Sequence, residues 1–172
     1  MPNSAFLARK SRKRSGSKKA APLFIIPLIF ALDRLTKQGV IALLGERESR
    51  PVIPGIFHLT RVTNTGAAFG LFRESAPLLI SVSVTAIGVL SFYLIRKIFF
   101  LSQGSSNAAA EDKFFFSGSS FVIAGALGNL VDRLQYGYVV DFFDFRIWPV
   151  FNLADMSVCF GVFLLLIPLL KK

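Results

Sequence analysis

Two polar side chains interrupt the last apolar segment of this chain. Almost every residue from Trp148 to Leu170 is apolar, yet Asn152 and Asp155 lie three positions apart within that segment. A carboxylate in a membrane helix costs at least about 2.5 kcal/mol on insertion scales, and intramembrane carboxylates are functional by default. Asp155 is therefore the first candidate for acid–base chemistry, and other groups must offset the cost of placing it there.

Other polar residues in apolar surroundings are spaced by one helical turn. Asp33 and Lys37 are four residues apart, and Asn129 is followed by Asp132 and Arg133 at the third and fourth positions. These spacings put each set on one face of a helix. Asp33 with Lys37 can equally form a structural ion pair, and Asp132 with Arg133 can cap a helix end and anchor it at the membrane interface. The residues alone leave both interpretations open.

Two further polar candidates, Asn64 and Asp141, lie between the apolar segments. Asn64 begins the sequence Asn-Thr-Gly, which is also typical of a simple turn. Asp144 lies two residues before Arg146, and we expect these two to form a solvated pair in a loop.

Metal and thiol chemistry have little support in the sequence. The chain has one cysteine, Cys159, and one histidine, His58, which are far apart. No His/Cys cluster with the spacing of metal ligands exists, so we expect neither a metal nor a cofactor. Cys159 can form no intrachain disulfide, and we expect it to be a small core or lipid-facing residue.

The composition is that of an integral membrane protein. Of 172 residues, 53% are hydrophobic and only 17% are charged, against roughly 25% in soluble domains. The net charge is +10, and seven lysines and arginines lie in residues 1–20 without an acidic residue. We interpret 1–20 as a disordered basic tail held in the cytoplasm beside anionic lipid. A nucleic-acid-binding tail is the alternative.

Four apolar runs predict a mainly α fold with four transmembrane helices, which together form one domain over residues 21–172. The runs cover approximately 21–44, 76–100, 114–131 and 150–170. The first begins like a signal peptide, but no small-x-small cleavage site follows, so we expect a retained helix. Between the first two runs, residues 56–63 alternate in polarity, which predicts a small extracytoplasmic β-containing segment.

The distribution of basic residues predicts the orientation of these helices. Lysines and arginines cluster at the tail, between the second and third runs, and at the C-terminal end. Under the positive-inside rule, both termini face the cytoplasm, and segments 45–75 and 132–149 lie on the opposite side. All the polar candidates then converge at one level near the outer membrane surface. Asp155 would find partners there from several other elements.

Five motifs in this chain resemble those of the lipoprotein signal peptidase (signal peptidase II) family. They are LDRLTK at 32–37, NTGAAFG at 64–70, AGALGNLVDRL at 124–134, VVDF at 139–142 and FNLAD at 151–155. They occur in the order of the family, and the resemblance covers about residues 21–170. Three details differ. Ala124-Gly125 stands where the family usually has Gly-Gly, the 14-residue separation of Asp141 and Asp155 suggests a trimmed outer loop, and the basic tail has no counterpart in the family core.

This resemblance implies an aspartic endopeptidase of the bacterial cytoplasmic (inner) membrane. Such an enzyme cleaves lipid-modified prolipoproteins before their diacylglyceryl-modified cysteine. It implies that Asp141 and Asp155 form the catalytic pair near the extracytoplasmic face of a multi-pass protein. Membrane lipids are the other expected partners; we expect no bound nucleic acid, and we expect a monomer.

The resemblance also implies roles for the other polar candidates. Asp33 and Lys37 match residues that support the pocket from the first helix, and Asp132 matches a motif aspartate outside the pair. The positions that match pocket-lining residues are Asn64, Gly66, Gly125, Asn129, Arg133, Asn152 and Ala154.

The chemistry of two adjacent carboxylates suits peptide hydrolysis. Because both cannot ionise cheaply, one proton is shared, so that one group can activate water while the other protonates the carbonyl oxygen. A small transporter or channel is a rival interpretation, but it would place polar groups on a path to both faces. The inner halves of the second, third and fourth runs are nearly free of charge. A membrane scaffold with a nucleic-acid-binding tail is a second rival.

Overall fold

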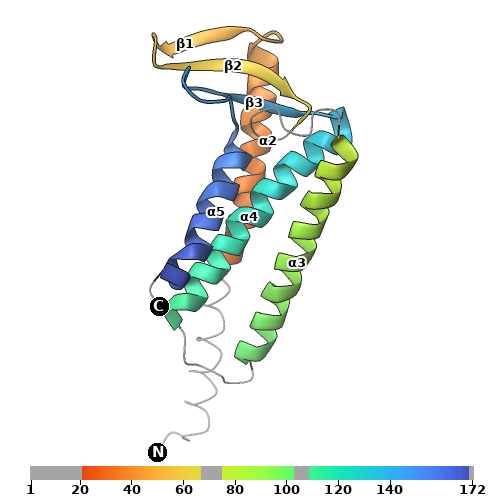
Figure 1. Cartoon of the computed structure of the whole chain (residues 1–172), viewed down its shortest axis with the longest axis vertical. Coiled ribbons are helices and arrows are strands. Elements are labelled where there is room, and N and C mark those ends of the chain that lie inside the picture. Colours follow the sequence, from red (N-terminus) through yellow and green to blue (C-terminus); the bar gives the residue numbers. More distant parts are fainter. Residues whose placement is uncertain (1–20, 67–74, 103–108, 171–172) are drawn as a thin grey trace, which may run out of the picture.

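The computed structural model describes residues 21–66, 75–102 and 109–170. Within these ranges a bundle of long helices carries a small sheet across one end (Figure 1). The elements in chain order are η1 (Ala21–Phe24), α2 (Ile25–Leu43), β1 (Ser49–Ile53), β2 (Phe57–Asn64), α3 (Ala76–Ser102), α4 (Ala109–Tyr136), β3 (Val139–Asp144) and α5 (Leu153–Leu170). The basic tail, the end of the NTGAAFG motif and the last two lysines lie outside the described residues.

Three helices of the described part of the chain are long and apolar enough to cross a membrane. They are Ala76–Phe100, Lys113–Tyr136 and Leu153–Leu170. The expected fourth span is not among them, because α2 carries Asp33, Arg34 and Lys37 within its 19 residues. The prediction of a mainly helical membrane protein is therefore confirmed, whereas the count of four spans is not.

Helix boundaries differ from the expected ones where local interactions decide them. The run expected over 114–131 continues as α4 to Tyr136. It ends there because Gly137 adopts φ 78° and donates its N–H to the carbonyl of Arg133 at 3.0 Å, a glycine C-terminal cap. The run expected to begin at Val150 becomes helical only at Leu153, because Phe151 pairs with Phe143 in an isolated β-bridge.

Helix α4 is the central helix of the bundle. Each of the three long apolar helices contains an apolar stretch of 18 residues. In α4, 61% of that stretch is buried, against 6% in α3 and 17% in α5. Close approach of α4 and α5 depends on small residues. A Cβ added at Gly125 would lie 2.3 Å from the carbonyl oxygen of Ala154, and one at Gly161 would lie 2.6 Å from the carbonyl oxygen of Gly118.

The sheet is antiparallel, with strand order β1-β2-β3. The alternating pattern correctly predicted β2, whereas β1 and β3 carry no comparable pattern. The sheet packs over the end of α2 through Val40, Leu44, Val140 and Phe142. This contact brings β3, and with it Asp141, to the end of the helix bundle where α4 finishes and α5 begins (Figure 1).

The prediction for Asp144 and Arg146 was partly wrong. The two side chains do pair, at 2.9 Å, but Asp144 lies in β3 and is only 5% exposed. A sheet neighbour explains its burial, because the hydroxyl of Thr60 on β2 donates to Asp144 Oδ2 at 2.7 Å.

Candidate active site

Asp141 and Asp155 open onto one cavity at the junction of the sheet and the helices. Asp141 lies on β3, and Asp155 lies in the first turn of α5. The cavity has a volume of about 700 Å³ and extends between α3, α4 and α5. Away from the two carboxylates its lining is mainly apolar, and Leu79, Val82 and Ala126 are examples.

The position of Asp155 follows from the way in which α5 begins. Asn152 is the N-cap residue, and its Oδ1 accepts the N–H of Asp155 at 2.9 Å. In return, Asp155 Oδ2 accepts the N–H of Asn152 at 3.2 Å. This reciprocal pair is a capping box, with aspartate in the place of the usual glutamate. The positive end of the helix dipole therefore favours a negative charge on Asp155.

Asp141 is 2% exposed, and amide groups surround its carboxylate. Asn64 donates to Oδ2 at 2.8 Å, and Asn152 donates to Oδ1 at 2.7 Å. Burial, followed by the negative charge of Asp155, raises the pKa of Asp141 to about 7, although the two amide hydrogen bonds oppose the increase. Asp141 can therefore hold a proton near neutral pH.

Two asparagines connect these carboxylates to the interior of the bundle. Asn152 contacts Asp141 and also donates to Asn129 Oδ1 at 3.1 Å. Asn129 donates to Asp155 Oδ1 at 2.8 Å and accepts from Lys37 Nζ at 2.9 Å. Because an ammonium group can only donate, Lys37 fixes the orientation of the Asn129 amide and directs its NH₂ group to Asp155.

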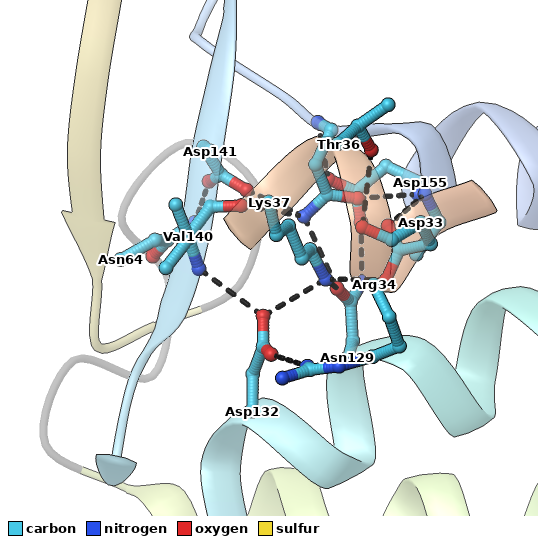
Figure 2. Close-up of polar contacts among 12 residues, drawn as sticks. Asp33, Arg34, Thr36, Lys37, Asn64, Asn129, Asp132, Val140, Asp141 and Asp155 are labelled. Carbon is cyan, nitrogen blue, oxygen red and sulfur yellow. Dashed lines mark hydrogen bonds and ion pairs between the residues drawn. The ribbon is translucent and has the colours of Figure 1, made fainter. Parts of the chain in front are cut away.

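Lys37 belongs to a buried ionic cluster behind the two carboxylates (Figure 2). Its Nζ lies 2.9 Å from Asp33 Oδ2 and 2.8 Å from Asp132 Oδ2, and all three side chains are at most 1% exposed. The remaining oxygen of Asp33 accepts the N–H of Ala154 at 3.0 Å. Asp33 thus supplies a second acceptor to the start of α5, and the cluster holds this helix end in place.

The partner of Asp132 differs from the expected one. The sequence offered the adjacent Arg133 as a possible partner at the helix end, but Asp132 Oδ1 pairs with Arg34 on α2 and Oδ2 pairs with Lys37. Arg133 instead donates to the carbonyl oxygen of Gly66 at 3.2 Å and lines the cavity. Sequence reasoning missed Arg34, although its position next to Asp33 in the LDRLTK motif was a usable signal.

The other sequence-predicted site residues fall into two groups. Those that line the cavity are Asn64, Gly66, Asn129 and Arg133. Those that lie behind its lining are Gly125, Asn152 and Ala154: Gly125 and Ala154 form the close contact of α4 with α5, and Asn152 connects the two carboxylates. Among the described residues, no group of three or more His, Cys, Asp or Glu side chains is placed to hold a metal ion.

The fold and the site together define a multi-pass membrane enzyme with a paired-carboxylate site. Residues 25–171 match the family model of signal peptidase (SPase) II. The chain is 41% identical to the lipoprotein signal peptidase of Halothermothrix orenii, over 86% of this chain and 94% of that relative. It is 45% identical to that of Pelotomaculum thermopropionicum, over 82% and 86% of the two chains.

Solved structures agree with this assignment. One bacterial membrane enzyme superposes with a TM-score of 0.75 at 30% identity and covers 88% of each chain. A second superposes with a TM-score of 0.73 at 30% identity, over 88% of this chain and 94% of that one. The chain belongs to the signal peptidase II family, and the resemblance found in its motifs is confirmed.

Proposed function

We propose that this protein is an aspartic endopeptidase of the bacterial membrane that removes signal peptides from prolipoproteins. Cleavage falls before the diacylglyceryl-modified cysteine of the substrate. The observation that carries this proposal is the opening of Asp141 and Asp155 onto one cavity, each with both oxygens held by donors. The family membership of the chain supports the same reaction.

The surroundings of the two aspartates divide their roles. Asp155 lies at the positive end of α5 and accepts a backbone N–H, so it is the ionised general base. Asp141, with a pKa of about 7, carries the shared proton and is the general acid. In the first step Asp155 takes a proton from water, the water oxygen bonds to the scissile carbonyl carbon, and Asp141 protonates the carbonyl oxygen.

The second step breaks the peptide bond and restores the pair. One hydroxyl of the tetrahedral intermediate returns its proton to Asp141 as the carbonyl re-forms. Asp155 gives its proton to the departing nitrogen, so the C–N bond breaks to yield an amine and a carboxylic acid. Both aspartates then have their starting protonation states. The donors from Asn64, Asn129 and Asn152 keep the two carboxylates oriented throughout.

The apolar part of the cavity suits a substrate that is already anchored by acyl chains. Its walls come from α3, α4 and α5, and all three are helices long and apolar enough to cross a membrane. A prolipoprotein can therefore bring its modified cysteine to the two aspartates without leaving the lipid. Membrane lipids are then natural neighbours of this site, and one chain carries a complete site as a monomer.

We further propose four spans, with α2 as the fourth and with the site near the extracytoplasmic face. Helix α2 lies beside α4 and α5 in the bundle (Figure 1). Its charged Asp33 and Lys37 are buried and paired, which lowers the cost of placing them at membrane depth. The basic residues at both ends of the chain favour cytoplasmic termini. Reporter fusions at residues 1 and 172 test this, and an extracytoplasmic signal from either end would contradict it.

The decisive test is cleavage of a lipid-modified prolipoprotein by the purified protein in detergent. We expect the wild-type chain to release the signal peptide and Asp141→Asn to release none above background. Glu48→Gln is the control, because Glu48 directly precedes β1 and its half-exposed carboxylate is not among the residues that line the cavity. Cleavage by Asp141→Asn at the wild-type rate would refute the proposed mechanism.

A further inference from the structure

The segment between β3 and α5 forms part of the cavity wall. It covers residues 145–151, and Trp148, Pro149, Val150 and Phe151 line the cavity. Trp148 is the sole tryptophan of the chain and remains 59% exposed, and the neighbouring Ile147 is 94% exposed. An apolar surface of this kind beside a substrate cavity is suited to contact with an apolar ligand.

The two ends of this loop are held together. The backbone N–H groups of Phe142 and Phe143 donate to the carbonyl of Phe151 at 3.0 and 2.8 Å, and Phe151 N–H donates to Phe143 at 3.2 Å. The rings of Phe145 and Phe151 stack with their centroids 5.9 Å apart and an interplanar angle of 9°. The loop is therefore closed at its base, and its tip is the segment 146–150.

Asp144 holds the first residue of that tip. Its Oδ1 accepts the Arg146 N–H at 2.8 Å, and its Oδ2 accepts Arg146 Nη1 at 2.9 Å. Arg146 adopts φ 66°, a left-handed conformation that a non-glycine residue holds only when its surroundings impose it. Two interactions hold it: Ile147 N–H donates to the Phe145 carbonyl across this residue at 2.8 Å, and the carboxylate of Asp144 accepts from both its backbone and its side chain. Apart from that of Arg146 itself, the Asp144 side chain is the only one among these groups, so we expect the direction of the chain toward Trp148 to depend on it.

A directed series of hydrogen bonds secures Asp144 from the other strands. Because an ionised carboxylate only accepts, the hydroxyl of Thr60 must donate to it, at 2.7 Å. The hydroxyl of Ser49 must then donate to Thr60, at 2.8 Å, and His58 Nδ1 must donate to Ser49, at 3.1 Å. The series ties β1, β2 and β3 to the loop, and both of its hydroxyl groups, those of Ser49 and Thr60, donate their hydrogen within it.

We propose that Asp144 is a positioning residue for substrate: through Arg146 it places Trp148 as the wall that contacts the lipid-bearing end of the prolipoprotein. The inference rests on the proposed function. The lipid-bearing end is the expected occupant because the wall is apolar and continuous with the apolar lining from α3 and α5. The polar groups of the cavity are gathered at the two aspartates, where the peptide must lie.

The test compares binding with catalysis in Asp144→Asn, Trp148→Ala and the double variant. The substrates are one prolipoprotein carrying long acyl chains and the same protein carrying short ones. We expect each single variant to raise KM for the long-chain substrate about tenfold while kcat changes by less than about threefold. The double variant should be little worse than either single one, because both changes disrupt one contact.

The control and the spectroscopic readout come from the chain itself. Glu48 pairs with Arg50, two residues further along, at 2.8 Å. This pair has the same spacing as Asp144 and Arg146, but its carboxylate is more exposed to solvent. Glu48→Gln should therefore leave KM unchanged. Trp148 emission should shift to longer wavelength in Asp144→Asn, because a displaced indole is more solvated. Thr60→Val should reproduce the shift and Thr60→Ser should not, since serine keeps the donor.

Different outcomes overturn different claims. If folded Asp144→Asn keeps the wild-type KM and Trp148 emission while Asp141→Asn is inactive, the positioning role is refuted and the proposed function stands. If KM rises equally for long-chain and short-chain substrates, the wall contacts the signal peptide, and the lipid assignment is refuted. If Asp141→Asn is fully active, the proposed function itself is refuted.

Discussion

Asn152 and Asp155 cap each other at the start of α5, with Asp155 N–H donating to Asn152 Oδ1 at 2.9 Å and Asn152 N–H donating to Asp155 Oδ2 at 3.2 Å. The same asparagine donates to Asp141 at 2.7 Å. A helix-capping residue therefore also connects the two candidate catalytic carboxylates. The stability of the helix end and the alignment of the site depend on one side chain, which explains why polar groups stand inside an apolar segment.

The first prediction concerns the pair itself. Asp141→Asn and Asp155→Asn should each abolish cleavage. An amide can neither take a proton from water in place of Asp155 nor give one to the carbonyl oxygen in place of Asp141, and loss of acid–base function costs about 10²–10⁴-fold. The double variant should be little worse than either single one, because the pair acts as a unit. The measurement is the initial cleavage rate per folded molecule.

Asp132→Asn is the internal control for that pair. Asp132 is bound to Arg34 and Lys37, so its substitution should reduce folding yield more than chemistry. A well-folded but inactive Asp132→Asn, together with an active Asp141→Asn, would show that Asp132 and Asp155 form the pair instead.

The second prediction concerns pH. The pKa of Asp141 in the folded protein is about 7, because of burial and the charge of Asp155, against the ordinary value of 3.8 for an aspartate. The folded protein then holds a proton that the unfolded chain has lost, so this contribution to stability is complete below pH 3.8 and is lost as pH rises to about 7. Asp141→Asn should remove that slope from the free energy of unfolding.

Activity should follow the same titration. If Asp141 is the general acid, kcat/KM should fall as pH rises through about 7, where its proton is lost. A pH–rate profile on the purified protein measures this directly. A profile flat from pH 6 to pH 9 would contradict the assignment of Asp141 as the proton donor.

The third prediction concerns the ionic cluster. Lys37→Ala leaves two buried carboxylates, Asp33 and Asp132, without their shared cation. Removal of one partner from a buried ionic group typically costs about 3–5 kcal/mol, so folding yield and thermal stability should fall sharply. The pH profile of any residual activity should stay similar, because Lys37 transfers no proton. Arg50→Ala, in an exposed pair, should change stability by less than about 0.5 kcal/mol.

The fourth prediction concerns the contact of α4 with α5. Gly125→Ala would place a methyl group 2.3 Å from the carbonyl oxygen of Ala154, so the two helices must separate. We expect a loss of about 1–3 kcal/mol, with reduced activity because Ala154 precedes Asp155. Gly88→Ala on α3 is the matched control, because nothing lies within 4 Å of its added methyl group. Equal thermal midpoints for the two variants would contradict this account.

Local patterns in the sequence determined much of the architecture. The apolar runs predicted the long helices, the alternation around residues 57–63 predicted β2, and the three-residue spacing of Asn152 and Asp155 put both on one helix turn. These features depend on neighbours within a few residues, and the periodicity of the chain records them directly. The sequence also predicted that the polar groups converge at one end of the bundle, because successive helices were expected to run in opposite directions.

Only the tertiary structure decided which charged groups pair. Asp132 has Arg133 beside it in the sequence, yet its partners are Arg34, 98 positions away, and Lys37. The burial of Asp144 likewise depends on Thr60, a neighbour supplied by sheet register. A buried charge takes the partner that packing brings within reach, and long-range packing leaves no periodic signal in the sequence. The sequence therefore determined which groups meet at this end of the bundle, and the packing of α2, α4 and the sheet determined how each one is bound.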